Sequence, residues 1–292
     1  NQAQFLEQTI QSVLDQDYPN IEYLVVDGGS TDGSVEIIQR YSDRLDWWVS
    51  EKDRGQADGI NKGLARARGK YVAWLNSDDF FLPGAVRQAV ALLEQHPELA
   101  FVHGDLQVVD ENGKVINVLT YGDWGVRGLM AFKIIGQPAV FMRRSALEQA
   151  GLLDLSYHFL LDHQLWLRLS LQGNTLYHPT LWAGEHVHAA SKNTAQAAQF
   201  GQEAYRIVEW MKNVPAFAPQ LAGNLRKVQA GAERLNAFYL LEAGQYQASF
   251  RSYWRAFWLH PNAVLSDWYR MLYALFAPLG LEIWKESYLR KR

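Results

Sequence analysis

The stretch that decides the fold is Tyr71-Val72-Ala73-Trp74-Leu75-Asn76-Ser77-Asp78-Asp79. Its first five residues are apolar and carry no charge, which is typical of a strand buried on both faces of a sheet. The run ends in two adjacent carboxylates, Asp78 and Asp79. Open α/β sheets bind ligands beyond the carboxyl ends of their strands. The stretch therefore predicts a buried strand that delivers an acidic cluster to a ligand site.

Strands and helices alternate on both sides of this stretch. Apolar runs predict strands at residues 21–26, 45–50 and 99–104. Helical spacing of apolar residues, with glycine or proline at the ends, predicts helices at 34–41, 56–68 and 83–95. This alternation is typical of an α/β fold with a Rossmann-like, mostly parallel sheet and helices on both faces.

The pattern is less regular after residue 105. It predicts a hairpin over 107–120 that turns at Asn112-Gly113, a strand at 139–142, a short helix capped by Ser145, and a helix over 162–172. From Thr194 onward the sequence predicts helices only. We therefore divide the chain into an α/β domain, residues 1–193, and a helical region, residues 194–292. Within the latter, 239–261 resembles one tetratricopeptide-like hairpin, most simply interpreted as part of a helical cap.

The chain begins on a helical pattern that includes Phe5, Ile10 and Leu14 and leads directly to the strand at 21–26. An α/β domain rarely opens on a helix placed directly before a buried strand. We therefore expect that a first strand of the fold is missing from this sequence.

Composition excludes several classes of function. The 292 residues are 48% hydrophobic, enough for a full core, and the net charge of −3 argues against non-specific binding of nucleic acid. The absence of cysteine excludes disulfides, cysteine zinc sites and thiol nucleophiles, and fits a reducing, cytoplasmic location. No apolar run reaches the ~18 residues that a membrane span requires.

The first acidic candidate is Asp27, which ends the strand at 21–26 and is followed by Gly28-Gly29-Ser30. The glycines allow close approach of the backbone to a ligand, and the carboxylate would accept hydrogen bonds from a base or ribose. A turn is the alternative, and for Asp32 we prefer a helix N-cap. The segment is not a phosphate-binding Walker loop, because the Gly-Lys-Ser/Thr ending is absent.

The second candidate is the pair Asp78-Asp79. Adjacent carboxylates at the mouth of a strand repel each other unless a cation lies between them. Their hard oxygen ligands suit Mg²⁺ or Mn²⁺, which would bridge to a substrate diphosphate. The alternative is a solvated turn that caps the helix beginning at Pro83.

The third candidate is Asp162, at the start of the helix over 162–172. It is either a helix N-cap or, if it faces a cleft, a general base. His186 and His188 flank Val187 and would point the same way on a strand, so that both could bind a metal. Single histidines are more often structural, and the sequence alone leaves both questions open.

Five segments, taken in order, resemble family 2 glycosyltransferases with the GT-A fold. They are Val25 to Ser34, Glu51 to Gly63, Trp74 to Asp79, Gln137-Pro138 and Asp162 to Leu169. The resemblance covers roughly residues 1–193, and the ordered set is far more specific than any one segment.

This resemblance implies roles for individual residues. Asp27 would contact the nucleotide base, expected to be uracil, and Gly29, Asp58, Asn61, Lys62, Ser77 and Asp79 would belong to the donor site. Asp78 would be the main metal ligand of the family's Asp-x-Asp motif. Asp162 would deprotonate the acceptor hydroxyl. His188 matches a position that touches the metal or diphosphate in some members.

The sequence departs from the family pattern at two positions. Asn76 replaces the first Asp of the motif, so metal affinity would depend on Asp78 and the diphosphate. Leu161 replaces a Glu that often precedes the catalytic Asp, which leaves Asp162 as the one carboxylate for that role. The implied reaction is inverting transfer from a UDP-sugar to an acceptor hydroxyl, with Mn²⁺ or Mg²⁺. The alternatives are a nucleotidyltransferase and a non-catalytic GT-A-like binding protein.

The helical region is rich in aromatic residues, followed by basic residues near its end. The aromatic residues are Trp254, Phe257, Trp258, Trp268, Tyr269, Tyr273, Phe276, Trp284 and Tyr288, and the basic ones are Lys285, Arg290, Lys291 and Arg292. Such a combination suits the interface of a membrane, where a lipid-linked saccharide acceptor would lie, at the inner face of the plasma membrane. Packing of the helices on one another is the alternative.

Overall fold

The structure is a computed structural model, and it describes residues 1–188 and 197–279. Contacts within the chain divide it into two units. The first consists of Asn1–Val126 and Ile134–Val187, and the second of Arg127–Lys133 and His188–Arg292. The predicted domain boundary near residue 193 lies outside the described residues, as do Trp284, Tyr288 and the basic C-terminal end.

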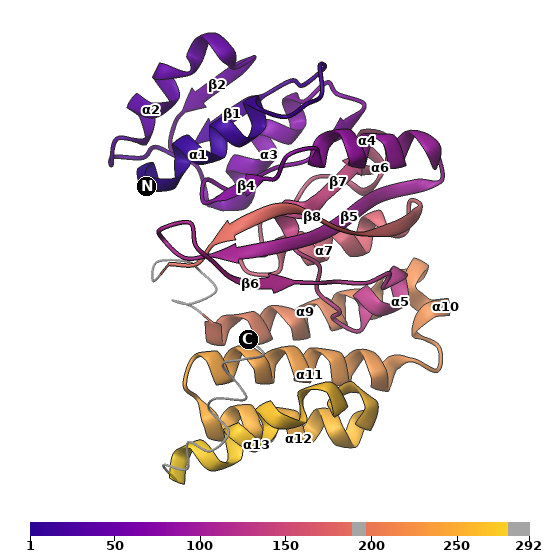
Figure 1. Cartoon of the computed structure of the whole chain (residues 1–292). Coiled ribbons are helices and arrows are strands. Elements are labelled where there is room, and N and C mark those ends of the chain that lie inside the picture. Colours follow the sequence, from indigo (N-terminus) through magenta and orange to yellow (C-terminus); the bar gives the residue numbers. More distant parts are fainter. Residues whose placement is uncertain (189–196, 280–292) are drawn as a thin grey trace. The chain divides into compact units, whose positions relative to one another are not determined.

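A small parallel sheet forms one part of the first unit (Figure 1). Strand β1 (Leu24–Asp27) pairs with β2 (Trp47–Ser50), so that Asp27 lies opposite Ser50. Helices α1 (Ala3–Leu14) and α2 (Ser34–Arg40) pack on these strands, and α3 (Gln56–Arg66) follows β2. One core cluster joins α1, β1 and α2 through Leu6, Ile10, Val25, Ile37 and Ile38. The predicted strand–helix alternation is confirmed here.

The larger sheet of the first unit has six strands. They are β3 (Tyr71–Val72), β4 (Asp79–Phe81), β5 (Leu99–Val109), β6 (Val115–Leu119), β7 (Val140–Arg143) and β8 (Asn174–His186). Their order is β3-β7-β5-β8-β4, with β6 paired to β5. Between these strands in the chain lie helices α4 (Ala85–Gln95), α6 (Arg144–Ala150) and α7 (Leu161–Leu169). The core includes the fully buried rings of Phe101, Trp166 and Trp182.

The expected α/β fold is confirmed, but the larger sheet is mixed rather than mostly parallel. Of its pairings, β5 with β8 is parallel, while β3–β7, β4–β8, β5–β6 and β5–β7 are antiparallel. The predicted hairpin explains one of these, since a short turn can join only antiparallel strands. More generally, apolar runs locate strands but do not specify their direction.

Several predicted boundaries differ from the structure. Strand pairing of β3 ends at Val72, three residues before the predicted end. The cap predicted at Ser145 is wrong, because α6 already begins at Arg144 and its N-cap residue is Arg143, without a side-chain cap bond. Helix α7 ends at Leu169 rather than at residue 172. Such shifts are common where no strong capping residue marks the end of an element.

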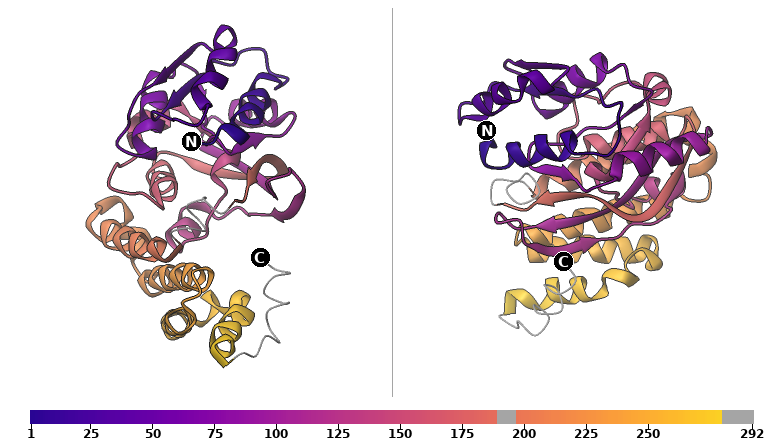
Figure 2. Two further views of the ribbon diagram at one scale, coloured as in Figure 1. Left: turned by 90° about the vertical axis from the view of Figure 1, so that its left-hand side faces the viewer. Right: turned by 45° about the horizontal axis from the view of Figure 1, so that its top comes forward.

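The described part of the second unit is helical, as predicted from the sequence after residue 194. Its main helices are α9 (Phe200–Asn213), α10 (Ala218–Leu221), α11 (Leu225–Glu242), α12 (Tyr246–Leu259) and α13 (Trp268–Phe276), with α5 (Gly125–Met130) leading into its first segment. Helix α11 lies between α9 and α12 (Figures 1 and 2). Gly244, with φ +70°, turns the chain between α11 and α12, so the predicted helical hairpin is confirmed.

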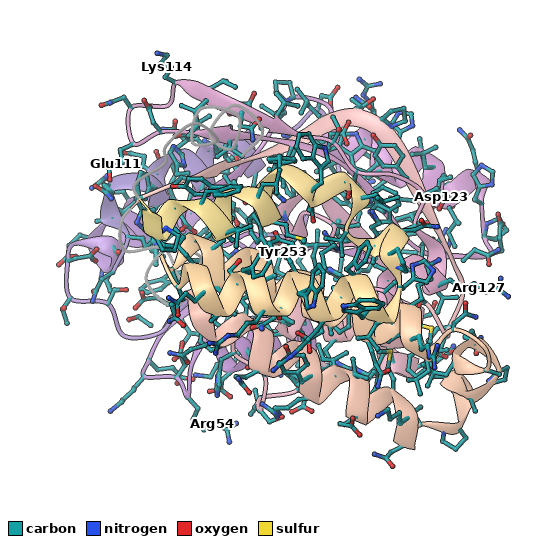
Figure 3. All side chains as sticks on the ribbon, turned by 90° about the horizontal axis from the view of Figure 1, so that it is seen from below. Arg54, Glu111, Lys114, Asp123, Arg127 and Tyr253 are labelled. Carbon is teal, nitrogen blue, oxygen red and sulfur yellow. The ribbon has the colours of Figure 1, made fainter. Side chains whose placement is uncertain are left out.

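The described part of this unit buries two carboxylates, Glu203 and Asp267. Tyr253 lies among the helices (Figure 3) and is fully buried. Buried Asp267 lies between two guanidinium groups, at 3.3 Å from Arg234 Nη1 and 3.4 Å from Arg270 Nη1. Arg234 also donates to the carbonyl oxygen of Phe132, which ties segment Arg127–Lys133 to α11. Within the described residues, each helix is too short or too polar to cross a bilayer.

Candidate active site

The turn after β1 holds Asp27 as a buried, ionised acceptor. Its Oδ2 accepts hydrogen bonds from the backbone N–H groups of Gly29 (3.0 Å) and Ser30 (2.9 Å) and from the hydroxyl of Ser50 (2.7 Å). Burial alone would raise the pKa of Asp27, but hydrogen bonds from Ser30, Ser50 and Gly29 outweigh it and hold the pKa below its usual value. Gly29, with φ +87°, allows the turn that aims these donors.

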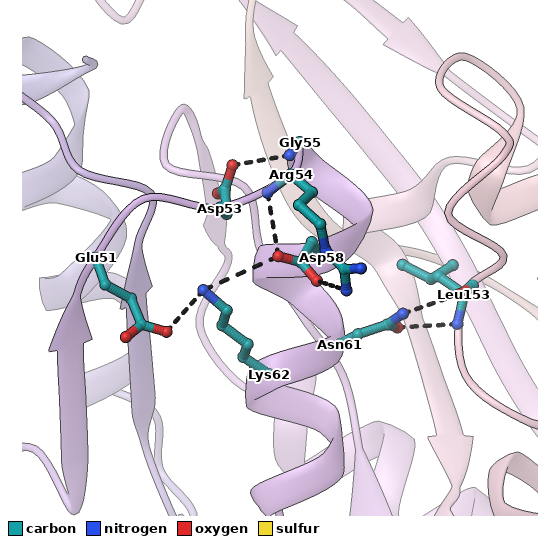
Figure 4. Close-up of polar contacts among 8 residues, drawn as sticks. All are labelled: Glu51, Asp53, Arg54, Gly55, Asp58, Asn61, Lys62 and Leu153. Carbon is teal, nitrogen blue, oxygen red and sulfur yellow. Dashed lines mark hydrogen bonds and ion pairs between the residues drawn. The ribbon is translucent and has the colours of Figure 1, made fainter.

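A second carboxylate, Asp53, lies against the same turn. A Cβ atom on Gly28 would stand 2.3 Å from Asp53 Oδ2, and one on Gly59 of α3 would stand 3.1 Å from it. Asp53 Oδ1 accepts from the N–H of Gly55 at 2.9 Å (Figure 4). Sequence reasoning assigned no role to Asp53. The signal was the pair of glycines that make room for its carboxylate.

The first three residues connect this turn to the acidic cluster. The N–H of Thr31 donates to Asn1 Oδ1 at 2.7 Å, and the N–H of Ala3 donates to Asp32 at 2.9 Å. Between them, Gln2 Nε2 donates to Asp78 Oδ2 at 3.2 Å. Three consecutive residues thus contact both the Asp27 turn and Asp78. Asp32 also accepts from the N–H and hydroxyl of Ser34 at the start of α2, although Gly33 is the N-cap residue.

A chain of side-chain amides leads to Asp79. Asn76 Nδ2 donates to Asp79 Oδ2 at 2.8 Å and to Gln137 Oε1 at 3.1 Å, while Asn76 Oδ1 accepts from Gln56 Nε2 at 2.8 Å. Gln137 in turn donates to the carbonyl oxygen of Trp74. The departure from the family motif at Asn76 therefore has a structural use, since an amide can donate to Asp79 where a carboxylate could not.

Strand β8 adds two polar residues to the acidic cluster. Glu185 pairs with Asp79 across the strands, and His186 Nδ1 lies 2.8 Å from the carbonyl oxygen of Asp78. Burial raises the pKa of Asp79 well above its usual value, and the charges of Asp78 and Glu185 raise it further. Burial and the charge of Asp78 raise the pKa of Glu185 to about 7. Sequence reasoning missed Glu185, because it predicted no strand over 174–186.

The donor set fits a hard divalent cation that also binds ligand oxygens. Among the described residues, no group of three or more His, Asp or Glu side chains is arranged to hold a metal. Asp78, Asp79 and Glu185 nevertheless bring three carboxyl groups together, and burial, followed by their mutual repulsion, raises the pKa values of Asp79 and Glu185, which a bound cation would counteract. His188 is buried and belongs to the second unit, whereas Asp78 belongs to the first. The metal roles of Asp78 and His188 stay predictions.

The three residues predicted on α3 are engaged by neighbours (Figure 4). Asp58 accepts from the backbone N–H and the guanidinium of Arg54, and these bonds lower its pKa. Lys62 forms an ion pair with Glu51 at 2.8 Å. Asn61 donates to the carbonyl oxygen of Leu153 and accepts from its N–H, at 2.8 and 2.9 Å. Their donor-site roles stay predictions.

Asp162 is half-buried in the first turn of α7. It is not the N-cap, because that position is Leu160 and no side chain caps the helix. Asp162 shares a helix face with Trp166, four residues on, whose ring stacks on Trp74 at 5.3 Å. Since Trp74 lies two residues before Asn76, α7 packs against the chain that leads to the acidic cluster.

Ser77 contributes through its backbone. The hydroxyl of Thr9 on α1 lies 2.9 Å from the carbonyl oxygen of Ser77 and 2.7 Å from that of Asp79. Helix α1 therefore holds the backbone of the acidic loop through Thr9. The donor-site role of the Ser77 side chain stays a prediction.

Comparison with known proteins gives a consistent result. The family model described as Glycosyl transferase family 2 matches residues 1–147. The putative teichuronic acid biosynthesis glycosyltransferase TuaG of Bacillus subtilis is 32% identical over 222 residues, which cover 72% of this chain and 85% of that protein. An uncharacterized glycosyltransferase of Haemophilus influenzae is 37% identical over 120 residues, or 40% of this chain and 47% of that protein.

Two solved proteins share the fold. S. aureus TarS 1-349 has a TM-score of 0.62 at 15% identity, over 100% of this chain and 89% of that one. The structure of the same protein in complex with UDP-GlcNAc has a TM-score of 0.57 at 16% identity, over 93% of this chain and 76% of that one. The mannosyltransferase PcManGT from Pyrobaculum calidifontis, in complex with GDP-Man and Mn²⁺, gives 0.61 at 21% identity over 98% and 85%.

Proposed function

The chain belongs to glycosyl transferase family 2, and we propose that it transfers a sugar from a nucleotide-diphosphate donor to an acceptor hydroxyl, with inversion at the anomeric carbon. One observation carries this proposal. Residues Asn1 to Ala3 contact both the Asp27 turn and Asp78, so that they connect the proposed base-binding carboxylate to the acidic cluster within the first unit.

The proposed donor is a UDP-sugar. An ionised Asp27, fixed by three hydrogen bonds, is an acceptor suited to the ring N–H of uracil. Asp53, beside Gly28, adds a second acceptor close by. The complex of TarS with UDP-GlcNAc supports this donor class, while the GDP-Man complex of PcManGT makes guanine the natural comparison in a binding experiment.

We assign the diphosphate end of the donor to the acidic cluster. Asp78, supported by Asp79, would hold Mn²⁺ or Mg²⁺ together with phosphate oxygens, and the ion would supply charge neutralisation for the leaving diphosphate. His186 fixes the backbone of Asp78 with two bonds to its carbonyl oxygen, from Nδ1 at 2.8 Å and from N–H at 3.1 Å. Asn76 orients Asp79 from the opposite side. Both residues therefore act by positioning.

Asp162 is the proposed general base. Its carboxylate would take the proton of the acceptor hydroxyl as the oxygen attacks the anomeric carbon from the face opposite the diphosphate. A single displacement of this kind inverts the configuration. Leu161, buried at the position where family members often carry Glu, offers no second carboxylate.

The proposed acceptor is a saccharide or lipid-linked saccharide of the cell envelope. The similarity to TuaG, a protein of teichuronic acid biosynthesis by its name, supports this class. We propose that transfer takes place in the cytoplasm, at the inner face of the plasma membrane where such acceptors are assembled.

The test is Asp162→Asn, which keeps the shape of the side chain and removes the base. We expect the rate of transfer to fall about 10²- to 10⁴-fold, because general-base catalysis contributes that much. Affinity for UDP with Mn²⁺, measured by calorimetry, should stay within about twofold, since the proposed role of Asp162 is toward the acceptor hydroxyl and not the nucleotide. Release of UDP from a panel of UDP-sugars gives the rate.

Asp123→Asn is the matched control, because Asp123 is an exposed carboxylate in a loop of the same unit (Figure 3). It should leave both rate and affinity unchanged. Full transfer by Asp162→Asn would refute the base assignment. If the unmodified chain did not bind UDP in the presence of Mn²⁺, the proposed donor would be refuted instead.

A further inference from the structure

Helix α12 has one face buried in the second unit and one face in solvent. Ser249, Ser252, Tyr253 and Ala256 are buried. The opposite face carries Arg251, Trp254, Arg255 and Trp258, all of which are exposed, and we call these four residues the α12 face. Trp258 has 70% of its surface exposed and Trp254 45%, which is unusual for the side chain with the largest apolar area.

The two exposed tryptophans form part of a continuous aromatic surface. Trp254 stacks on Phe257 with ring centroids 5.8 Å apart, and its ring meets that of Trp258 edge-on at 5.8 Å. Phe250 extends the row at 6.3 Å from Trp254. Two more apolar side chains that follow α12 in the chain are also exposed, Leu265 by 60% and Trp268 by 50%. Exposed aromatic side chains in mutual contact are typical of an interaction site.

The charges on this segment have one sign. From Gly244 to Ser266 the sequence contains two charged residues, Arg251 and Arg255, and no Asp or Glu. Arg255 Nη1 lies 3.9 Å from Glu233 Oε1 on α11, and the Glu233 side chain is mostly buried, with 14% exposed. The α12 face thus offers arginine beside tryptophan without an exposed acid in the same segment.

Charge decides between the two simplest partners for this face. In a symmetric dimer through the α12 face, each copy would present the same patch, which brings four arginines together without an acidic partner in this segment. An anionic bilayer matches both properties instead. Tryptophan prefers the boundary between headgroups and acyl chains, and arginine is attracted to anionic headgroups.

We propose that the α12 face binds the surface of an anionic phospholipid membrane, with Trp254 and Trp258 inserted at the interface and Arg251 and Arg255 among the headgroups. Packing of the helices on one another accounts for Tyr253, Tyr269 and Tyr273, which are buried, but not for these two tryptophans. The inference deepens the proposed function, which places transfer at the inner face of the plasma membrane. The two can fail separately, because this test measures vesicle binding and the earlier one measures transfer.

The experiment is co-sedimentation of the full chain with vesicles. Binding is expected to vesicles of phosphatidylcholine mixed with phosphatidylglycerol, to weaken in high salt, and to be at least about tenfold weaker to phosphatidylcholine alone. Trp258→Ala should weaken binding severalfold, and Arg251→Glu combined with Arg255→Glu about tenfold or more. Trp258 is the safest aromatic site to change, because most of its surface already lies in solvent.

Ile116→Ala is the matched control, because Ile116 on β6 is 56% exposed and lies in the first unit. It should bind vesicles like the unmodified chain. The proposal would be overturned if Trp258→Ala and the double arginine variant both bound anionic vesicles as well as the unmodified chain does. Absence of binding to anionic vesicles would also overturn it. A dimer in sedimentation velocity that Trp258→Ala converts to monomer would assign the face to a second copy instead.

Discussion

His103, on β5, is the residue whose environment gives the clearest dependence of stability on pH. Its ring is 2% exposed, and burial lowers its pKa to about 4. The unfolded chain therefore binds a proton at a higher pH than the folded chain does. The stability contributed by neutral His103 is complete above about pH 6.5 and is lost as the pH falls toward 4.

We expect this residue to account for about 2 kcal/mol of unfolding free energy lost between pH 6.5 and 5. His103→Phe keeps an aromatic ring beside Phe101 and Tyr177 and removes the titration. Urea unfolding at both pH values should show a smaller loss for this variant than for the unmodified chain. His96→Asn, at an exposed histidine, should show the full loss. Equal losses for all three proteins would contradict the prediction.

At the scale of residues, the sequence indicated those that stand at the ends of strands. Asp27 and Asp78 were recognisable because a run of apolar residues leads directly to each. Glu185 and Gln56 were not, because their contacts with the acidic cluster depend on which strand lies beside β4 and on the start of α3 lying beside Asn76. Those are tertiary facts, and no local pattern records them.

At the scale of helices, replacing each of two glycines by alanine is expected to change the stability of the chain in opposite directions. Glycine inside a helix costs about 1 kcal/mol relative to alanine. A Cβ atom on Gly63 of α3 would meet only Val26, at an ordinary 3.7 Å, so Gly63→Ala should stabilise the chain by up to about 1 kcal/mol. A Cβ atom on Gly231 of α11 would lie 2.1 Å from the carbonyl oxygen of Ala131. Gly231→Ala should therefore destabilise, by roughly 2 kcal/mol.

Thermal unfolding of the two variants, followed by circular dichroism, tests this pair. The transition should move up for Gly63→Ala and down for Gly231→Ala. A rise for both would mean that helix propensity alone decides, and that the close approach of α11 to segment Arg127–Lys133 is unimportant.

Strand β8 shows why some elements escape prediction. Pro179 lies in its middle, and proline normally argues against an internal strand. The structure accommodates it at an irregularity, where the pairing of His103 with Tyr177 is followed by that of Asp105 with Leu181. Such a bulge leaves the proline without a ladder bond to make. Strand β4 escaped for another reason, since its three residues are too few for a periodic pattern.

Across the whole molecule, donor and metal should stabilise the chain together. UDP with Mn²⁺ at about 100 times the dissociation constant should add about 2.7 kcal/mol to the free energy of unfolding, equivalent to a rise of about 4 °C in Tm. Mn²⁺ alone should add little, because Asp78 lacks a complete set of protein ligands among the described residues. Chelator should abolish transfer, and added Mn²⁺ or Mg²⁺ should restore it.

Differential scanning fluorimetry with UDP and Mn²⁺ separately and together measures this coupling. Asp78→Asn should lose the part of the shift that requires metal. An unchanged shift by UDP in the presence of chelator, with full transfer, would remove Asp78 from the metal role.

The ordered set of motifs was sufficient to predict the family and the α/β class. It was not sufficient to predict which segments of the chain belong to each of the two units. Segment Arg127–Lys133 belongs with the helices because Arg234 donates to its backbone and Gly231 approaches it closely. These partners stand about a hundred residues further along the chain. Sequence periodicity describes neighbours within an element and carries no information at that range.

Asn61 has a consequence for how a mutational scan of this enzyme is to be interpreted. Both ends of its amide are bonded to Leu153, and Arg168 of α7 holds the carbonyl oxygens of Ala150, Gly151 and Leu152. The loop before α7 is therefore fixed from two helices. Replacing Asn61 would release one of these attachments and displace Asp162, and small displacements of this kind cost rate without loss of any substrate contact. In a screen for activity, Asn61 would score as a donor ligand even if it never touches the donor.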